Sequence, residues 1–240
     1  MSKIVQRGYV PTDKKDFNAK SVEVLYQAGK DLFYLLNRGY KIKGASTFIG
    51  NHYMLSERQR LALVRAVSSK EDIEIRKEKE ICNLKGQSVN IDGFNTIITL
   101  EVALSDSLLF HCMDDTIRDL AALRGTYRLI DKTDTAIDLI GKELEKNKIR
   151  KAVFYLDSPV SNSGRLAQQI RTRLNPFPFE VETEIICQVD SVLETMENVI
   201  TSDAIILNKC LSWYNLNGNI IKNNLQNTFC IDFSKAKGLF

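Results

Sequence analysis

The stretch Val89-Asn90-Ile91-Asp92-Gly93-Phe94-Asn95-Thr96-Ile97-Ile98 places an acid where a strand pattern gives way to a helix pattern. Val89 to Asp92 has the apolar character of a short strand, and the residues after Gly93 have the spacing of an amphipathic helix. In open parallel sheets, ligands bind at the carboxyl ends of the strands. Asp92 is therefore a candidate ligand residue, and acids in the same setting elsewhere in the chain would be its partners.

From residue 88 onward, apolar runs of strand length alternate with amphipathic helices. This alternation predicts an α/β fold in which helices cover both faces of a parallel sheet. The expected strands are 88–92, 108–112, 127–130, 151–157, 181–187, 199–201 and 228–232. The expected helices are 94–104, 115–123, 133–146, 163–174, 190–197 and 203–212, and the Asn-rich run 215–227 is typical of an exposed loop or hairpin.

Residues 1–82 are expected to form a small helical region. Apolar residues at helical spacing predict a helix over 18–38, and Ser56-Glu57-Arg58-Gln59 matches a capping box that starts a second helix. That second helix is expected to reach Val67. The remaining segments are expected to be a loop at 40–55, which contains Gly44 and Gly50, and a charged helix or linker at 68–80.

The charges divide unevenly between the two parts of the chain. Residues 1–82 carry 16 Lys and Arg against 10 Asp and Glu, whereas residues 83–240 carry 17 against 20. A basic front beside an acid-containing domain suits a protein that holds a polyanion near a metal. Chance explains the same excess equally well, because small helical units often carry a few extra charges.

The composition argues against several classes of protein. The five cysteines form no CxxC pair, which speaks against a disulfide framework or zinc ribbon and fits a reducing cytoplasm. No apolar stretch reaches membrane-spanning length, and the first residues do not resemble a signal peptide. The chain has no GxGxxG or GxxxxGK[ST] motif for nucleotides, and only His52 and His111 are available for nucleophilic catalysis.

Three later acids occupy junctions like that of Asp92. Asp157 ends the expected strand 151–157, Asp190 follows the strand 181–187, and Asp203 ends Val199-Ile200-Thr201-Ser202-Asp203. Each acid has an alternative role as a helix cap or first-turn residue. As a set they would converge, because parallel strands end along one edge of the sheet. Converging carboxylates repel one another, and Mg²⁺ or Mn²⁺ would remove that cost.

A candidate anion-binding element follows Asp157. In Ser161-Asn162-Ser163-Gly164-Arg165, small residues open a helix whose backbone N–H groups face outward, and Arg165 adds positive charge. Simple N-capping by Ser161 or Ser163 explains the same residues, so both interpretations stay open.

Several of these segments resemble the motifs of PIN-like nucleases, particularly the NYN branch. Ile91-Asp92-Gly93-Phe94-Asn95 is similar to their first motif, and Val153 to Asp157 resembles their central strand acid. Val189 to Leu193, followed by Val199 to Asp203, resembles their paired C-terminal acids. The resemblance covers roughly residues 86–210. The whole chain also resembles an uncharacterised microbial family that joins a small helical region to such a domain.

The resemblance implies a three-layer α/β sandwich with a mainly parallel central sheet over residues 83–240, preceded by the helical region 1–82. It implies a divalent-metal-dependent nuclease that hydrolyses phosphodiester bonds, chiefly in RNA, with Mg²⁺ or Mn²⁺ as cofactor. The implied metal ligands are Asp92, Asp157, Asp190 and Asp203, of which Asp92, Asp157 and Asp203 would be the catalytic acids. The implied supporting or substrate-binding residues are Asn95, Asp115, Asp119, Ser161, Ser163, Arg165 and Ser202.

One further acid of the PIN pattern has several candidates in this chain. Many PIN domains place it in a helix between the first and central strands, where Asp114, Asp115 and Asp119 compete and Glu101 is a weaker alternative. On the expected helix 115–123, Asp115 and Asp119 would share one face. Arg118 would alternatively neutralise a neighbouring acid, and a solvated, capped helix start accounts for the same residues.

Other functions stay open at this point. The fold would also serve a non-catalytic nucleic-acid-binding or adaptor protein, and the same acids would serve a hydrolase of small phosphate esters. The expected partner is nucleic acid, RNA before DNA. No membrane partner is expected, a homo-oligomer stays open, and the expected compartment is the cytoplasm.

Overall fold

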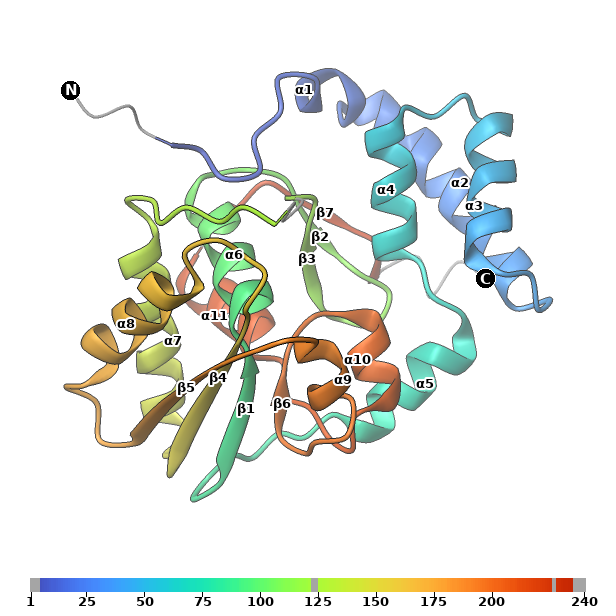
Figure 1. The fold of residues 1–240 in the computed structure, drawn as a ribbon. Coiled ribbons are helices and arrows are strands. Elements are labelled where there is room, and N and C mark those ends of the chain that lie inside the picture. Colours follow the sequence, from blue (N-terminus) through green and yellow to red (C-terminus); the bar gives the residue numbers. More distant parts are fainter. Residues whose placement is uncertain (1–4, 122–124, 226–227, 235–240) are drawn as a thin grey trace.

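A four-stranded parallel sheet in the order β5-β4-β1-β6 forms the centre of the computed structural model, which describes residues 5–121, 125–225 and 228–234 (Figure 1). Its strands are β1 (Ser88–Asp92), β4 (Lys151–Asp157), β5 (Glu180–Ile186) and β6 (Val199–Ile200). Ile91 pairs in register with Phe154 on β4 and with Ile200 on β6, so three neighbouring strands end along one edge. The predicted α/β fold with a parallel central sheet is confirmed.

Helices cover both faces of this sheet. Side chains alternate along β4, so that Ala152, Phe154 and Leu156 join one apolar core, whereas Val153 and Tyr155 join another. The first core is completed by α6 (Gly93–Leu104), α7 (Thr133–Lys146), α8 (Ser163–Leu174) and α11 (Leu216–Asn224). The second core is completed by α9 (Val189–Leu193), α10 (Ala204–Lys209) and the buried Trp213.

A second, three-stranded sheet lies beyond the central one. Strand β2 (Leu109–His111) pairs antiparallel with β3 (Ile117–Asp119) and parallel with β7 (Cys230–Asp232). The N-terminal helices α1 (Asp13–Asp16), α2 (Ala19–Leu36), α3 (Ile42–His52), α4 (Glu57–Ala66) and α5 (Lys70–Lys79) precede it in the chain.

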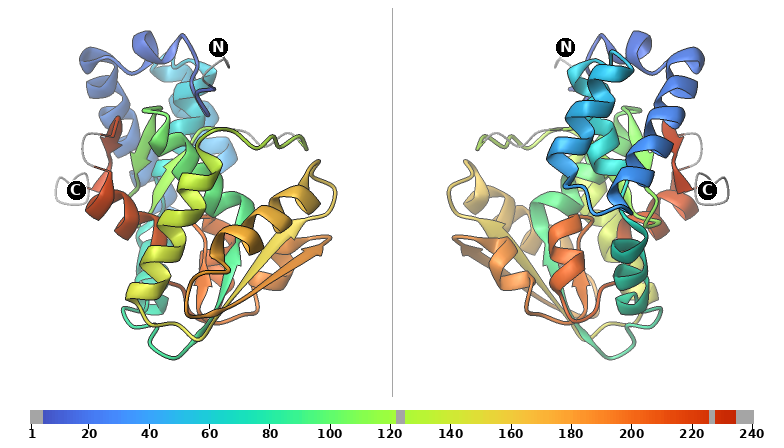
Figure 2. Two further views of the ribbon diagram at one scale, coloured as in Figure 1. Left: turned by 90° about the vertical axis from the view of Figure 1, so that its left-hand side faces the viewer. Right: turned by 90° about the vertical axis from the view of Figure 1, so that its right-hand side faces the viewer.

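The N-terminal helices share one apolar core with the second sheet. Leu25, Leu32 and Leu63 of the helices cluster with Phe110 of β2 and with Phe233, which follows β7. Figure 2 accordingly shows the blue N-terminal helices beside the red C-terminal segment. Within the part of the chain that the structure describes, no helix combines the length and apolarity needed to cross a membrane.

Most predicted elements are confirmed. The strands 88–92 and 151–157 and the helices 133–146 and 163–174 occur with the expected bounds, and the helix expected over 18–38 is α2. The capping box is present in both directions, because Gln59 N donates to Ser56 Oγ (3.2 Å) and Ser56 N donates to Gln59 Oε1 (2.9 Å). The charged segment after Val67 forms α5.

Two segments predicted to be loops are helices instead. The loop expected at 40–55 is largely α3, where Gly50 permits a close approach of α4: a Cβ there would lie 2.5 Å from Arg60 Nη1. The loop or hairpin expected at 215–227 is largely α11, with residues 226 and 227 outside the described residues. Asn215 caps this helix by accepting from Gly218 N at 3.2 Å.

Two elements between β1 and β4 are also corrected. The expected helix 115–123 is wrong: the described residues form a tight turn and then β3, and residues 122–124 lie outside the described part. Asp115 has a φ of 63°, a left-handed conformation that a helix start does not allow. The expected strand 127–130 is absent, because Tyr127 is buried against Phe94 and makes no ladder there.

Candidate functional site

The turn from β1 into α6 fixes the position of Asp92. The Asp92 carboxylate caps α6 by accepting from Asn95 N at 3.2 Å. Gly93 is required by packing, since a Cβ there would lie 2.6 Å from Leu156 Cδ2 and 3.1 Å from the Tyr155 carbonyl oxygen. The glycine therefore lets α6 start directly against β4 and leaves Asp92 buried, only 7% exposed, at the sheet edge.

The turn after β6 is bound to the same helix start. Thr201 Oγ1 donates to Asp92 Oδ2 at 2.9 Å, and Asn95 Oδ1 accepts from the backbone N (2.8 Å) and hydroxyl (2.9 Å) of Ser202. Asp203 N donates to Thr201 Oγ1 at 3.1 Å, and the Asp203 carboxylate caps α10 by accepting from Ile205 N at 2.8 Å. Asn95 thus binds the 201–203 turn to α6.

The sheet edge brings the predicted acids into one electrostatic field. Burial raises the pKa of Asp92 to about 7; hydrogen bonds from Thr201 and Asn95 oppose the rise, and Asp190 and Asp203 add to it. Burial also raises the pKa of Asp190, with further contributions from Asp203, Asp157 and Glu194. Asp190 and Asp203 thus act on Asp92, and Asp157 and Asp203 act on Asp190; we refer to Asp92, Asp157, Asp190 and Asp203 below as the acid edge.

The carboxylates of the acid edge do not form a closed metal shell. Among the residues that the structure describes, no three His, Cys, Asp or Glu side chains gather closely enough to hold a metal ion. Two of the acids are engaged locally, since Asp203 caps α10 and Asp157 Oδ1 accepts from Val189 N at 3.4 Å. Asp190 is exposed at the start of α9.

The serines after β4 form hydrogen bonds with backbone atoms of the protein. The Ser163 hydroxyl lies 2.6 Å from the carbonyl oxygens of both Asp157 and Val160, and Ser161 Oγ accepts from Tyr127 N at 3.2 Å. Neither serine caps α8, which has no side-chain cap. Arg165 is exposed in the first turn of α8 and stays a candidate for phosphate contact.

The acids proposed for the mid-domain position lie in different surroundings. Asp115 is exposed on the turn before β3, whereas Asp119 is buried on β3, where Thr99 Oγ1 donates to it at 2.7 Å and burial raises its pKa. They do not share a helix face, so that expectation is wrong. Glu101 is fully buried, accepting from Arg7 Nε at 2.8 Å and from the Tyr127 hydroxyl at 2.7 Å.

Asp114 lies in a buried ion cluster with two arginines. Arg76 Nη1 is 2.6 Å from Asp114 Oδ2, and Arg118 pairs with the same oxygen, as the neutralising role expected of Arg118 requires. Burial alone would raise the pKa of Asp114, but Arg118 and Arg76 outweigh it and hold that pKa well below its usual range. Two guanidinium groups against one carboxylate leave a buried excess of positive charge.

Arg118 also connects the acid edge to the helical region. Its Nε donates to the Ser202 carbonyl at 2.6 Å and its Nη1 donates to the Arg65 carbonyl of α4 at 2.7 Å. Thr201 and Arg76 were not predicted from the sequence, and neither was the link that Arg118 makes between the 201–203 turn and α4. The position of Thr201 between a strand end and Asp203 was a usable signal, whereas Arg76 lies in a charged helix that resembles a solvated surface.

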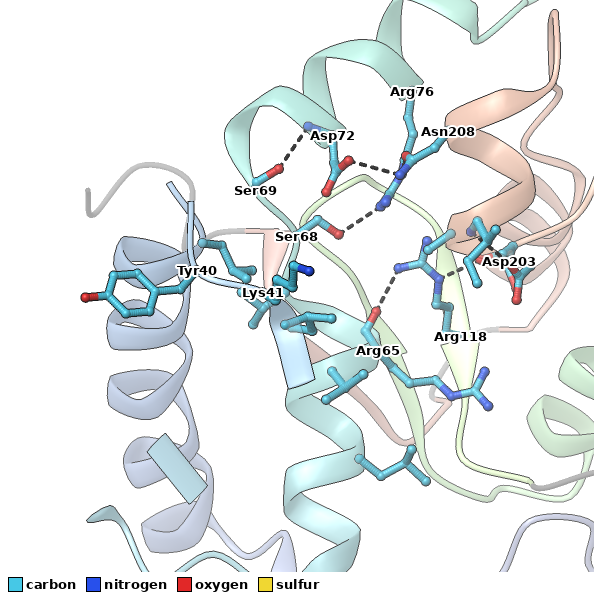
Figure 3. A pocket seen from close by; sticks show the side chains of 18 of the residues that line it. Tyr40, Lys41, Arg65, Ser68, Ser69, Asp72, Arg76, Arg118, Asp203 and Asn208 are labelled. Atoms are coloured by element: carbon cyan, nitrogen blue, oxygen red, sulfur yellow. Dashed lines mark hydrogen bonds between the residues drawn. The ribbon is translucent and has the colours of Figure 1, made fainter. Parts of the chain in front are cut away.

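A pocket of about 610 Å³ opens beside this connection (Figure 3). Residues of α2 to α5 line one side, and Ser202, Asp203 and the start of α10 line the other. In the close-up, Arg118 lies between Arg65 and Asp203. Lys41, the residue before α3, also lines the pocket. We call it the interregion pocket.

Comparison with known proteins places these features in a family. The profile of a family described as a domain of unknown function (DUF5616) matches residues 81–219, more than half of the chain. The chain belongs to this family. A second profile, described as a protein of unknown function (DUF434), matches residues 24–79. All four acids lie in the DUF5616 region, and the interregion pocket is lined from both regions.

A similar protein is known from an archaeon of the genus Methanocaldococcus. Uncharacterized protein MJ0935 of Methanocaldococcus jannaschii is 39% identical over 183 residues, which cover 75% of this chain and 88% of that protein. No solved structure matches the chain significantly.

Proposed function

We propose that this protein is a divalent-metal-dependent nuclease of PIN-like type that hydrolyses phosphodiester bonds in RNA. The observation that carries the proposal is the position of Asp92, Asp157 and Asp203 at or just after the ends of neighbouring parallel strands, with the exposed Asp190 at the start of α9. Burial of Asp92 beside Asp190 and Asp203 disfavours the ionised carboxylate and raises its pKa to about 7. A site built at such a cost is typical of function rather than of stability.

The chemistry of the donor set, though not the spacing of its carboxylates in this structure, suits Mg²⁺ or Mn²⁺. Carboxylate oxygens are the ligands these ions prefer, and a divalent cation between Asp92, Asp190 and Asp203 would replace their repulsion by attraction. Asp157, which adds to the field on Asp190, would complete the set. When bound, such a metal supplies Lewis acidity toward a phosphoryl oxygen and lowers the pKa of water.

The chain's own residues would orient the acids and the substrate. Thr201 holds one oxygen of Asp92 and Asn95 N holds the other, so the carboxylate has a fixed direction. Asn95 and Arg118 hold Ser202 from opposite sides, through its N–H and its carbonyl, and thereby fix Asp203 in the next position.

The test is hydrolysis of labelled single-stranded and structured RNA with Mn²⁺ or Mg²⁺. We expect wild type to cleave, and Asp92→Asn to lose about 100-fold in rate, because an amide is a weaker ligand for Mg²⁺ or Mn²⁺ than a carboxylate. Asp106→Asn is the matched control: Asp106 is exposed beyond the far end of α6, and its φ of 51° suits asparagine. Equal rates for Asp92→Asn and wild type would remove the nuclease assignment.

A non-catalytic nucleic-acid-binding protein is the second candidate. The observation in its favour is that both oxygens of Asp92 and one of Asp203 already accept hydrogen bonds within the fold. This candidate predicts RNA binding that weakens with salt, without metal-dependent turnover. A parallel panel of nucleotides and phosphomonoesters would reveal a small-molecule phosphohydrolase.

A further inference from the structure

The interregion pocket combines apolar surface with positive charge. Ile42, Leu61 and Val64 line it and are 37%, 37% and 42% exposed, a high level for large apolar side chains. Lys41 and Arg65 also line it, and in the described ranges their head groups make no hydrogen bond or ion pair, although the charge of Arg65 acts on the buried Asp119 carboxylate. An apolar wall beside unpaired cations suits a ligand with a flat apolar part and an anionic part.

The pocket is continuous with the acid edge. Ser202 and Asp203 belong both to its lining and to the turn that Asn95 and Thr201 hold. Arg76 and Arg118, which pair with the buried Asp114, belong to the lining and together carry one positive charge more than Asp114 neutralises. A chain of phosphates that reaches Asp203 would therefore meet positive charge on the side of the helical region.

The volume indicates the size of the occupant. About 610 Å³ lies within the range of small-ligand sites and suits one nucleotide rather than a double helix. A base can pack its face on apolar side chains whatever its sequence, and phosphates bind Lys and Arg.

We infer that the interregion pocket holds one unpaired nucleotide of a single-stranded nucleic acid. This nucleotide neighbours the one whose phosphate lies at the acid edge. The phosphate of this nucleotide lies beside Lys41 and Arg65, and its base packs on Ile42, Leu61 and Val64. This inference rests on the proposed function for the identity of the polymer. It assigns the helical region the task of selecting unpaired strand, which the acid edge does not supply.

The test is binding in EDTA, where no metal-dependent cleavage occurs. Fluorescence anisotropy is measured with an end-labelled single strand of about 12 nucleotides, its duplex, and the same strand with one abasic position. We expect Lys41→Glu and Arg65→Gln each to weaken single-strand binding about 3- to 10-fold at 0.1 M salt. Each should also lower the slope of log affinity against log salt by about 0.7, the value for one lost phosphate contact.

Lys20→Glu is the matched control for charge. Lys20 is exposed near the start of α2, outside the pocket lining, so its reversal alters the total charge as Lys41→Glu does without entering the pocket. We expect this variant to bind like wild type, and wild type to prefer the single strand to the duplex. An equal loss in Lys20→Glu and Lys41→Glu would overturn the inference, and so would equal affinity for strand and duplex.

A second measurement uses unaltered protein. A photoreactive uracil in the strand should crosslink to peptides containing Leu61 or Val64, and crosslinks confined to other surfaces would overturn the inference. Failure of the two proposals can be told apart. If binding depends on the pocket but no hydrolysis occurs in Mn²⁺, the nuclease proposal fails and the pocket inference stands. If hydrolysis requires Asp92 but Lys41→Glu and Arg65→Gln bind like wild type, the pocket inference fails and the nuclease proposal stands.

Discussion

Replacing Asp92 by asparagine should make the protein more stable at neutral and alkaline pH. The pKa of Asp92 is raised from its ordinary value of 3.8 to about 7 by burial, with Asp190 and Asp203 adding to the rise. The folded state therefore binds a proton more tightly than the unfolded state. The stability that protonated Asp92 contributes to the folded state is fully present below pH 3.8 and is lost as the pH rises through about 7.

The size of the effect follows from the same pKa change. Raising the pKa from 3.8 to about 7 corresponds to about 4 kcal/mol of unfolding free energy lost by wild type between these pH values. The Asp92→Asn variant would have no such loss, and it keeps the local hydrogen bonds. The oxygen of the new amide accepts from Asn95 N, and its nitrogen donates to Thr201 Oγ1, whose hydrogen can turn toward Asn95 Oδ1 at 3.4 Å.

The assay is urea unfolding of both proteins from pH 4 to pH 8, because the difference between them cancels groups that titrate alike in both. We expect near equality at pH 4 and an advantage for Asp92→Asn that grows by about 1.4 kcal/mol per pH unit until about pH 7. Adding Mn²⁺ at about ten times its Kd should restore about 1.4 kcal/mol to wild type alone. A difference that does not vary with pH would refute the reasoning about the acid edge.

Three further substitutions test the surroundings of the acid edge. Gly93→Ala should cost about 1–3 kcal/mol in urea unfolding, because its Cβ meets Leu156 Cδ2 at 2.6 Å, whereas Gly164→Ala, where nothing lies within 4 Å, should cost nothing. Asp114→Asn should lower the unfolding free energy by about 3–5 kcal/mol, because two buried guanidinium groups lose their shared counter-charge, and a loss below about 1 kcal/mol would contradict the ion cluster. Asn95→Ala should cost about 1–3 kcal/mol and lower the thermal midpoint, because Ser202 N loses its acceptor, and an unchanged midpoint would argue against that role.

The elements that could be predicted from the sequence are those whose pattern is local. The strands ending at Asp92 and Asp157 combine an apolar run with a following helix, and both occur with the expected bounds. The second sheet could not be predicted, because Leu109 pairs with Cys230 across more than half of the chain. Only the folded chain brings these short apolar runs together.

The helical pattern of α11 was hidden by its high asparagine content. The Asn-rich segment forms α11 because Leu216 and Ile220 face the core at helical spacing, a pattern that the asparagines between them obscure. For the candidate site, the strand-end acids were visible in the sequence, but their supporting contacts were not. Arg76 on α5 meets Asp114, which lies 38 residues further along the chain, and no sequence period encodes a contact of that kind.

The core shared by the N-terminal helices and the second sheet has a consequence for how the chain can be divided. A fragment cut between the DUF434 and DUF5616 regions would expose Phe110 and Phe233. A fragment that also ends at residue 219 would lack both Phe233 and β7, which leaves one edge of β2 unpaired. Such a fragment would tend to aggregate, although its boundaries follow the family match. The two regions should therefore unfold in one cooperative transition, because residues from both family regions form a single folding unit.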